Sequence, residues 1–155
     1  MNALIEKIHK TGFVHDDLGN EYKLHSNLER AEGELLSQLI ESDPSVYKTL
    51  EIGCAYGLSS LYICSALSER AAARHIMIDP FQHKDWHGVG ISNLKRAGFN
   101  FYELIERPSE WALPELLQSA PATFDLVVID GWHTFDHTLL DLFYANRLIK
   151  IGGYL

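Results

Sequence analysis

Short apolar runs alternate with longer segments of helical periodicity along most of the chain. The segments "GLSSLYICSALSE" and "ISNLKRAG" carry apolar residues at helical spacing, and Gly98 stands where the second helix would end. Strands separated in this way by helices are typical of a parallel sheet with right-handed crossovers. The strand-like runs are "KTLEI" from Lys48, "HIMID" from His75, "FYELIE" from Phe101 and "FDLVVID" from Phe124.

The run "FDLVVID" is almost continuously apolar, which indicates an interior strand covered on both faces. We therefore expect an α/β fold in three layers around a mainly parallel central sheet. A helical stripe follows, which should end at Gly152 and Gly153 before a fifth strand begins at Tyr154 and Leu155. A chain that stops there leaves a central strand unpaired, so we expect truncation at the start of the fifth strand. The stripe consists of Phe135, Leu139, Leu142 and Ile149.

The beginning of the chain is more polar. Residues 1–25 include "HDDLGNEYKLH" and are predicted to form an N-terminal extension, while the domain itself spans residues 26–155. From Ser26 to Ser42, "SNLERAEGELLSQLIES" opens with a Ser/Asn cap signal and is interrupted by Gly33. This pattern predicts a helix packed on the sheet. Its apolar positions are Leu28, Leu35, Leu36, Leu39 and Ile40.

Composition narrows the choice of partners and of compartment. The formal net charge is -8 and no basic stripe offsets it, so no nucleic-acid partner is expected. No apolar run approaches the roughly 18 residues of a membrane span, and "MNALIEKIHKTGF" has no signal-like apolar core. We therefore expect a cytoplasmic protein without membrane contact. Cys54 and Cys64 are about three helical turns apart, and one helix would hold them too far apart for a disulfide bond. Both are interpreted as reduced structural thiols.

Three carboxylates stand at the ends of predicted strands, at Glu51, Asp79 and Asp130. The carboxyl ends of parallel strands share one rim, where ligands bind. The loop "GCAYGLSS" lacks the G-x-G-x-x-G spacing, which disfavours a pyrophosphate ligand. Asp79 is suited to accept hydrogen bonds from two ribose hydroxyls, because a carboxylate acts only as an acceptor. The pattern therefore favours a nucleoside without a polyphosphate.

The motifs "LEIGCAYGLSS", "IDP", "FDLVVIDGWH" and "LIKIGGYL", in this order, resemble those of class I S-adenosylmethionine-dependent methyltransferases. The similarity runs from about Glu32 to Leu155. The segment "EGELL", together with "IDG" and His133 eight residues before Asp141, is most similar to small-molecule O-methyltransferases of macrolide sugar and cephalosporin pathways. This resemblance implies a Rossmann-like fold with S-adenosylmethionine as cofactor.

The resemblance also implies residues for the cofactor site. The glycine loop would lie against the methionine and ribose parts, and Asp79 would bind the ribose hydroxyls. Two alternatives stay open: Gly53 and Gly57 permit tight packing only, or Asp79 is a helix cap or a solvated loop acid. The loop residues are Glu51, Gly53, Ala55 and Gly57.

The adenine would lie between two further segments. The resemblance places Pro80 and Phe81 beside the ring, and Pro108 and Ser109 at its other edge. Ser109 has an alternative as the N-cap before "WALPELL", in which Pro114 would occupy the first helical position. Asp130, on the same rim, is also assigned to the cofactor site.

The acceptor hydroxyl needs a base or a metal, and "DGWH" offers both. The resemblance implies that Asp130 binds Mg²⁺, that His133 is the catalytic base, and that further metal ligands would follow Leu155. His133 has an alternative as a capping or packed histidine. The i,i+4 pairs His133/His137 and His83/His87 raise a zinc alternative, although neither has a third ligand at a convincing spacing.

Three tryptophans, at positions 86, 111 and 132, are interpreted as core or lid residues, and the loop "FQHKDWHGVG" as a cover for the acceptor pocket. The sequence thus predicts S-adenosylmethionine-dependent methyl transfer to an oxygen of a small-molecule acceptor. A non-catalytic nucleoside-binding or scaffold domain and a nicotinamide-dependent dehydrogenase are the alternatives. The identity of the acceptor and the oligomeric state stay open.

Overall fold

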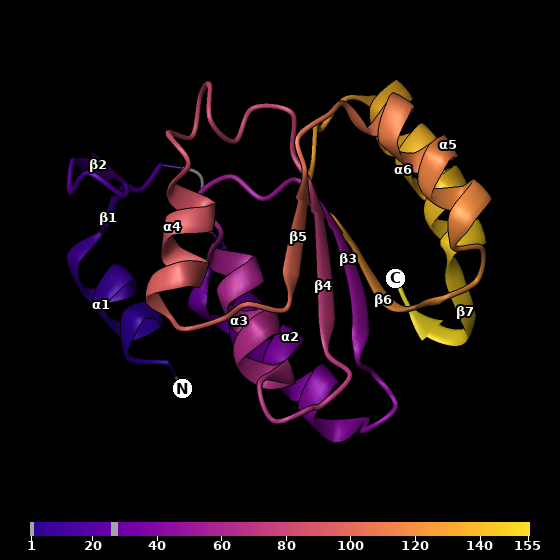
Figure 1. The fold of residues 1–155 in the computed structure, drawn as a ribbon, viewed down its shortest axis with the longest axis horizontal. Helices are drawn as coiled ribbons and strands as arrows, with labels where there is room; N and C mark the ends of the chain where they lie inside the picture. The colour runs from indigo at the N-terminus through magenta and orange to yellow at the C-terminus, as the bar shows by residue number, and fades with distance from the viewer. Residues whose placement is uncertain (1, 26–27) are drawn as a thin grey trace.

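A five-stranded parallel sheet forms the centre of the computed structural model, which describes residues 2–25 and 28–155 (Figure 1). The strand order is β5-β4-β3-β6-β7, and every neighbouring pair is parallel. The four predicted strands are confirmed, and β6 is an interior strand as expected. The strands are β3 (Lys48–Ile52), β4 (Arg74–Ile78), β5 (Tyr102–Ile105), β6 (Phe124–Ile129) and β7 (Ile149–Tyr154).

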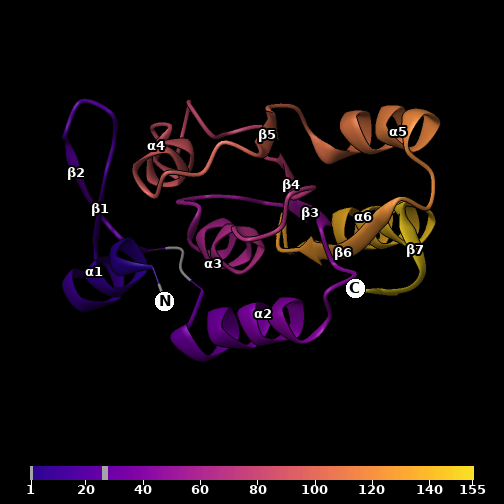
Figure 2. The ribbon, with the colours of Figure 1, turned by 60° about the horizontal axis from the view of Figure 1, so that its bottom comes forward.

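Helices cover both faces of this sheet, so the predicted three-layer α/β architecture is confirmed (Figures 1 and 2). One face carries α2, α3 and α4, and the other carries α5 packed against α6. None of the helices in the described ranges is long and apolar enough to cross a bilayer. The helices are α2 (Arg30–Ser42), α3 (Leu58–Leu67), α4 (Val89–Arg96), α5 (Ser109–Ser119) and α6 (Phe135–Leu148).

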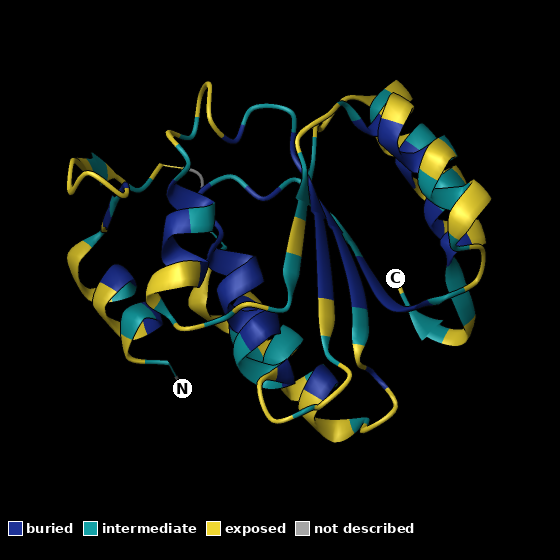
Figure 3. Cartoon of the chain, in the orientation of Figure 1, coloured by how far each residue is buried: buried dark blue, intermediate teal, exposed yellow. Residues whose placement is uncertain are grey.

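Because side chains alternate along the central strands, the two faces of the sheet carry different kinds of side chains. Leu50 and Ile52 of β3 pack into the cluster that includes Leu113 of α5 and Leu148 of α6. The residue between them, Glu51, therefore points toward the opposite layer, where α3 is buried along almost its whole length (Figure 3). The α3 side of the sheet consequently contains polar groups that need internal hydrogen-bond partners.

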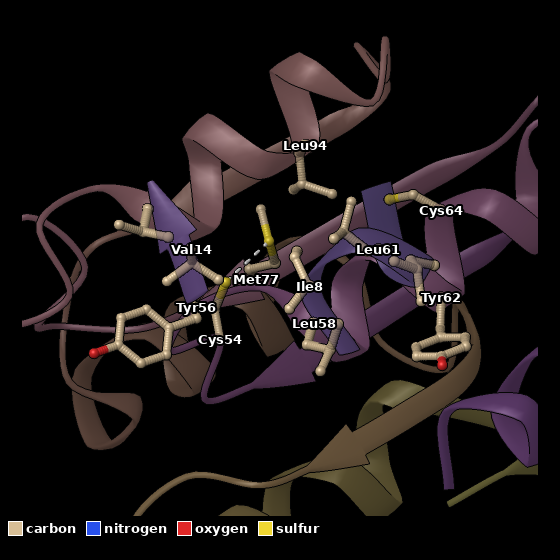
Figure 4. Packing of buried hydrophobic residues seen from close by; sticks show 12 residues of the cluster. Ile8, Val14, Cys54, Tyr56, Leu58, Leu61, Tyr62, Cys64, Met77 and Leu94 are labelled. Atoms are coloured by element: carbon tan, nitrogen blue, oxygen red, sulfur yellow. Dashed lines mark hydrogen bonds between the residues drawn. The ribbon is translucent and has the colours of Figure 1, made fainter. Parts of the chain in front are cut away.

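The structure corrects the predicted N-terminal extension. These residues fold into α1 (Ala3–Thr11) and a short antiparallel hairpin of β1 (Phe13–His15) and β2 (Glu21–Lys23). Ile5, Ile8 and Val14 are buried in the same cluster as residues of α3 and α4. Figure 4 shows Ile8 and Val14 within this core. Ile5 and Ile8 form a one-sided apolar stripe on α1, which the polar composition of the segment conceals.

Element boundaries differ from the prediction at α2 and β7. The helix α2 begins at Arg30, where the Glu29 N–H donates to Glu32 Oε2 over 2.8 Å. The predicted Ser26/Asn27 cap lies outside the described residues. Gly152 and Gly153, expected to end the last helix, lie inside β7, and the ladder between β6 and β7 is irregular there. Gly152 has a φ of 84°, which suits a glycine at such an irregularity.

The helices α5 and α6 also depart from the pattern. The predicted apolar stripe is exposed at Phe135 (83%), and also at Leu139 and Leu142, and Ile149 belongs to β7 rather than to the helix. Its buried counterpart in α6 is formed by Asp141, Ala145 and Leu148. In α5, the N-cap is Pro108, so the predicted N-cap at Ser109 and the predicted first-turn position of Pro114 are both wrong: Ser109 is the first helical residue and Pro114 lies inside the helix.

Replacing Ile5 by Ala should lower the free energy of unfolding by about 2–5 kcal/mol, because it leaves a cavity in the shared core. The matched control is Leu18→Ala in the hairpin loop, where the side chain is exposed and the change should stay within about 0.5 kcal/mol. Urea denaturation measures both. Equal, small effects would show that residues 1–25 do not contribute to the core.

Candidate functional site

A cavity of about 600 Å³ opens at the carboxyl ends of the central strands. The chain runs outward from β3 to β4 and β5, and then returns to β6 and β7 on the other side of β3. The loops after β3 and β6 therefore leave the sheet at a switch in strand order, which is where open α/β sheets bind ligands. Loops that follow β3, β4, β5 and β6 all contribute to its wall.

Most of the predicted site residues meet in this cavity. Two do not line it, namely Glu51 and Gly57. The predicted residues that line it are Gly53, Ala55, Asp79, Pro80, Phe81, Pro108, Ser109, Asp130 and His133.

Glu51 is fully buried beneath the loop that was expected to hold the cofactor. Its carboxylate accepts hydrogen bonds from the hydroxyls of Ser59 and Ser60 at the start of α3. The same carboxylate lies 3.2 Å from His75 Nε2, and the other ring nitrogen of His75 is 2.8 Å from Thr49 Oγ1. Glu51 thus connects β3, β4 and α3 and reaches the cavity only through Ser59, which lines it.

The two glycines of the loop allow neighbouring backbones to approach closely. A Cβ on Gly53 would lie 2.2 Å from the Asp130 carbonyl oxygen, and one on Gly57 would lie 2.8 Å from Gly90 Cα. Both residues also have positive φ, at 89° and 74°. Gly57 therefore fits the alternative in which a glycine only permits tight packing, since it lets the loop pack against α4. Gly53 permits tight packing and also lines the cavity.

Asp79 holds the shape of the loop. It is only 3% exposed, which excludes a solvated loop acid. Its Oδ2 accepts from the N–H groups of Cys54 (3.1 Å) and Ala55 (2.8 Å), and its Oδ1 accepts from the Phe81 N–H (2.9 Å). Ala55 has a φ of 46°, a conformation that a non-glycine residue adopts only under such constraint. A carboxylate has about four acceptor sites, so Asp79 keeps capacity for a further donor.

Asp130 and His133 belong to the loop after β6. His133 Nε2 lies 3.7 Å from Asp130 Oδ1, and the imidazole is 84% exposed. Burial raises the pKa of Asp130, and the neighbouring His133 opposes this shift. The pair is therefore open to a ligand, with the carboxylate partly withdrawn from water.

Aromatic rings form a wall next to this pair. Trp132 stacks on Phe81 with 5.8 Å between ring centroids and 20° between planes. His137, from the first turn of α6, contacts the edge of Trp132 at 5.0 Å. Trp132 was interpreted as a core or lid residue, but here it lines the cavity. The stack offers a flat apolar surface at the α5–α6 end of the site.

The other end of the cavity contains residues that sequence reasoning missed. His25 Nε2 and Tyr56 Oη are hydrogen bonded over 2.7 Å, and Trp86 contacts the Tyr56 ring at 5.0 Å. Burial raises the pKa of Tyr56. Tyr56 stands between the two loop glycines, a signal that could have been noticed. His25 gave no signal, because it belongs to the segment taken for an extension.

Metal ligands do not gather in the part of the chain that the structure describes: it contains no group of three or more His, Cys, Asp or Glu side chains able to hold an ion. His83 pairs with Glu106 at 2.7 Å, and His87 stacks on Tyr22. The zinc alternative therefore gains no third ligand, and Asp130 has no companion carboxylates among these residues for Mg²⁺.

The two cysteines agree with their structural interpretation. Cys54 and Cys64 are free and buried, and burial raises the pKa of both thiols. Neither is therefore a thiolate nucleophile at neutral pH.

Comparison with known proteins identifies a family that this chain matches. A family model described as a methyltransferase domain matches residues 50–155. A search of curated proteins gives no match.

Solved structures share the fold. Cofactor-bound Rv0187 from MTB is 25% identical, with a TM-score of 0.67 over 81% of this chain and 54% of that chain. The O-methyltransferase from Bacillus cereus, in complex with SAH, is 18% identical, with a TM-score of 0.74 over 97% of this chain and 63% of that chain. The O-methyltransferase TomG from Streptomyces achromogenes, in complex with SAM, is 24% identical, with a TM-score of 0.63 over 80% of this chain and 53% of that chain. The chain thus spans between 53% and 63% of their lengths.

Replacing Gly53 by Ala should destabilise the protein by about 2–5 kcal/mol, the sum of a left-handed conformation and overpacking against Asp130. Gly98→Ala is the matched control, because Gly98 has a φ of 83° but nothing within 4 Å of the added Cβ. It should cost only about 1–2 kcal/mol. Denaturant titration of both variants isolates the steric part, and equal losses would mean that the two backbones can separate without penalty.

Proposed function

We propose that this chain, which belongs to the methyltransferase domain family, transfers a methyl group from S-adenosylmethionine to an oxygen of a small molecule. The observation that carries the proposal is the convergence of Gly53, Asp79 and Asp130 on one cavity at the switch in strand order. Similar proteins from Bacillus cereus and Streptomyces achromogenes were solved with SAH and SAM, which supports the choice of cofactor.

The residues of the cavity fit the nucleoside half of this cofactor. Asp79 has acceptor capacity for ribose hydroxyls, and the stacked rings of Phe81 and Trp132 offer an apolar surface to a purine. Pro108 and Ser109 border the same end. The volume of about 600 Å³ lies within the range of small-molecule sites, which leaves space for an acceptor beside the cofactor.

The methionine half would lie along the loop after β3. Gly53 and Ala55 line the cavity there, and Ser59 contributes a hydroxyl that is oriented by Glu51. Glu51 is therefore a positioning residue in this proposal, because its carboxylate does not line the cavity. The acceptor would extend from His133 toward the end formed by Leu28, Tyr56 and Trp86, whose apolar surfaces suit a ring that carries the hydroxyl.

The bound cofactor supplies a methyl group on a positively charged sulfur, so the chain needs to align the acceptor and remove its proton. His133 is the base in this proposal: its exposed imidazole takes the proton of the acceptor hydroxyl as the oxygen attacks. The Asp130 carboxylate, 3.7 Å away, stabilises the imidazolium that forms. This proton transfer needs no metal ion, and the chelator arm of the assay below tests that.

Binding of S-adenosylhomocysteine tests the cofactor site. Wild type should bind it, and Asp79→Ala should bind it about 10- to 150-fold more weakly, the loss expected for hydrogen bonds to a charged acceptor. Asp17→Ala is the control, because this exposed carboxylate pairs with Lys95 away from the cavity. Calorimetry measures all three. Binding of NAD without binding of S-adenosylhomocysteine would favour a dehydrogenase and overturn the proposal.

Turnover tests the role of His133. With methyl-labelled cofactor and a panel of phenolic and sugar hydroxyl acceptors, His133→Ala should lower kcat by about 10²–10⁴-fold without changing cofactor affinity. His83→Ala is the control, since His83 pairs with Glu106 outside the cavity.

Three outcomes separate the alternatives. Full activity of His133→Ala would remove the base from the mechanism. Loss of activity with a chelator and recovery with magnesium would add a metal at Asp130. Cofactor binding without transfer to any acceptor would indicate a nucleoside-binding domain.

A further inference from the structure

Asp141 is a buried carboxylate with an unused oxygen in the cavity wall. It lies on α6, is 1% exposed and lines the cavity. Its Oδ1 has no hydrogen-bond partner within the described residues. The other side chains with this property, Ser65 and Ser92, are hydroxyls and do not line the cavity. A buried acceptor without a donor is destabilising, so this oxygen points to a partner that the chain itself does not supply.

The groups around Asp141 come from three elements. Ser109, at the first turn of α5, lies beside it and lowers its pKa, and Glu110 and His137 are its titratable neighbours. Its Oδ2 faces the Gly131 turn after β6, 3.6 Å from the place of a Cβ there. Burial raises the pKa of Asp141, against the opposing effects of Ser109 and His137.

The position of Asp141 indicates which part of the proposed cofactor would lie next to it. His137 precedes it by four residues, so both lie on one face of α6, and the His137 ring contacts Trp132 of the aromatic wall. Asp141 therefore stands at the edge of the flat surface offered to the purine. Asp79, the carboxylate proposed to bind the ribose, instead follows β4 and accepts from the loop after β3. Of the donors in S-adenosylmethionine, the exocyclic amino group is the one at the edge of the purine.

We infer that Asp141 Oδ1 accepts a hydrogen bond from the exocyclic amino group of the purine, and so makes the site specific for a 6-aminopurine. This inference rests on the proposed function. A 6-oxopurine presents an acceptor at that place, and a carboxylate is also acceptor-only, so the two oxygens would face each other unpaired. Sites built around such a hydrogen bond discriminate strongly against analogues that lack the donor.

The test compares S-adenosylhomocysteine with its 6-oxo analogue, S-inosylhomocysteine, by calorimetry. Wild type should bind the analogue at least about 10-fold more weakly. Asp141→Asn should bring the ratio close to one, because an amide can rotate to offer either its oxygen or its nitrogen. Glu115→Gln is the matched control, since it removes a carboxylate from an exposed position of the neighbouring helix α5, where it pairs with Arg107 outside the cavity, and should keep the wild-type ratio.

The outcomes distinguish this inference from the proposed function. If wild type binds neither nucleoside, the proposed function fails. If wild type binds both equally, the inference fails whatever the variants do. If wild type discriminates and Asp141→Asn keeps its ratio, another residue recognises the amino group, and the inference fails as well.

Thermal stability separates recognition from a structural role. The folded-state pKa of Asp141 is raised, so the protein loses stability as the pH rises from the unfolded pKa through the folded one. Asp141→Asn removes that loss, and the variant without ligand should melt no lower than wild type at pH 7. A lower Tm would show that the carboxylate supports the fold, and would overturn the inference.

Discussion

The hydrogen bonds from three backbone N–H groups to the Asp79 carboxylate determine the geometry of the whole rim. They join the loop after β3 to the loop after β4 and keep Ala55 in a left-handed conformation. With the loop fixed in this way, Gly53 can lie against the Asp130 carbonyl, and the ends of β3, β4 and β6 enclose one cavity. A carboxylate is well suited to this task, because it accepts several donors at once.

A second polar network supports the rim from below. Glu51, His75 and the hydroxyls at the start of α3 are buried in the layer between the sheet and α3. Their mutual hydrogen bonds satisfy groups that would otherwise destabilise the interior. The α5–α6 side of the sheet is mainly apolar by comparison. The contrast follows from strand alternation, which turns Leu50 and Ile52 to one layer and Glu51 to the other.

Sequence reasoning predicted the strands, the three layers and most of the cavity wall, because apolar runs and strand-end carboxylates are local signals. It placed Glu51 on the rim, although the two-residue period of β3 already directs this side chain beneath the loop. It missed His25, and it did not indicate that the apolar stripe of α6 is exposed, because both depend on contacts between distant segments. The free oxygen of Asp141 likewise follows only from packing against α5 and the Gly131 turn.

The N-terminal segment has a consequence for how this protein can diversify. The end of the cavity that is proposed to bind the nucleoside is built from crossover loops of the sheet, whereas the opposite end combines such loops with His25, which follows the β1–β2 hairpin. Under the proposed function, part of the acceptor site thus comes from a stretch of the gene that lies outside the cofactor-binding loops. Insertions or exchanges around the hairpin would remodel acceptor preference, while the cofactor half stays under its own selective pressure.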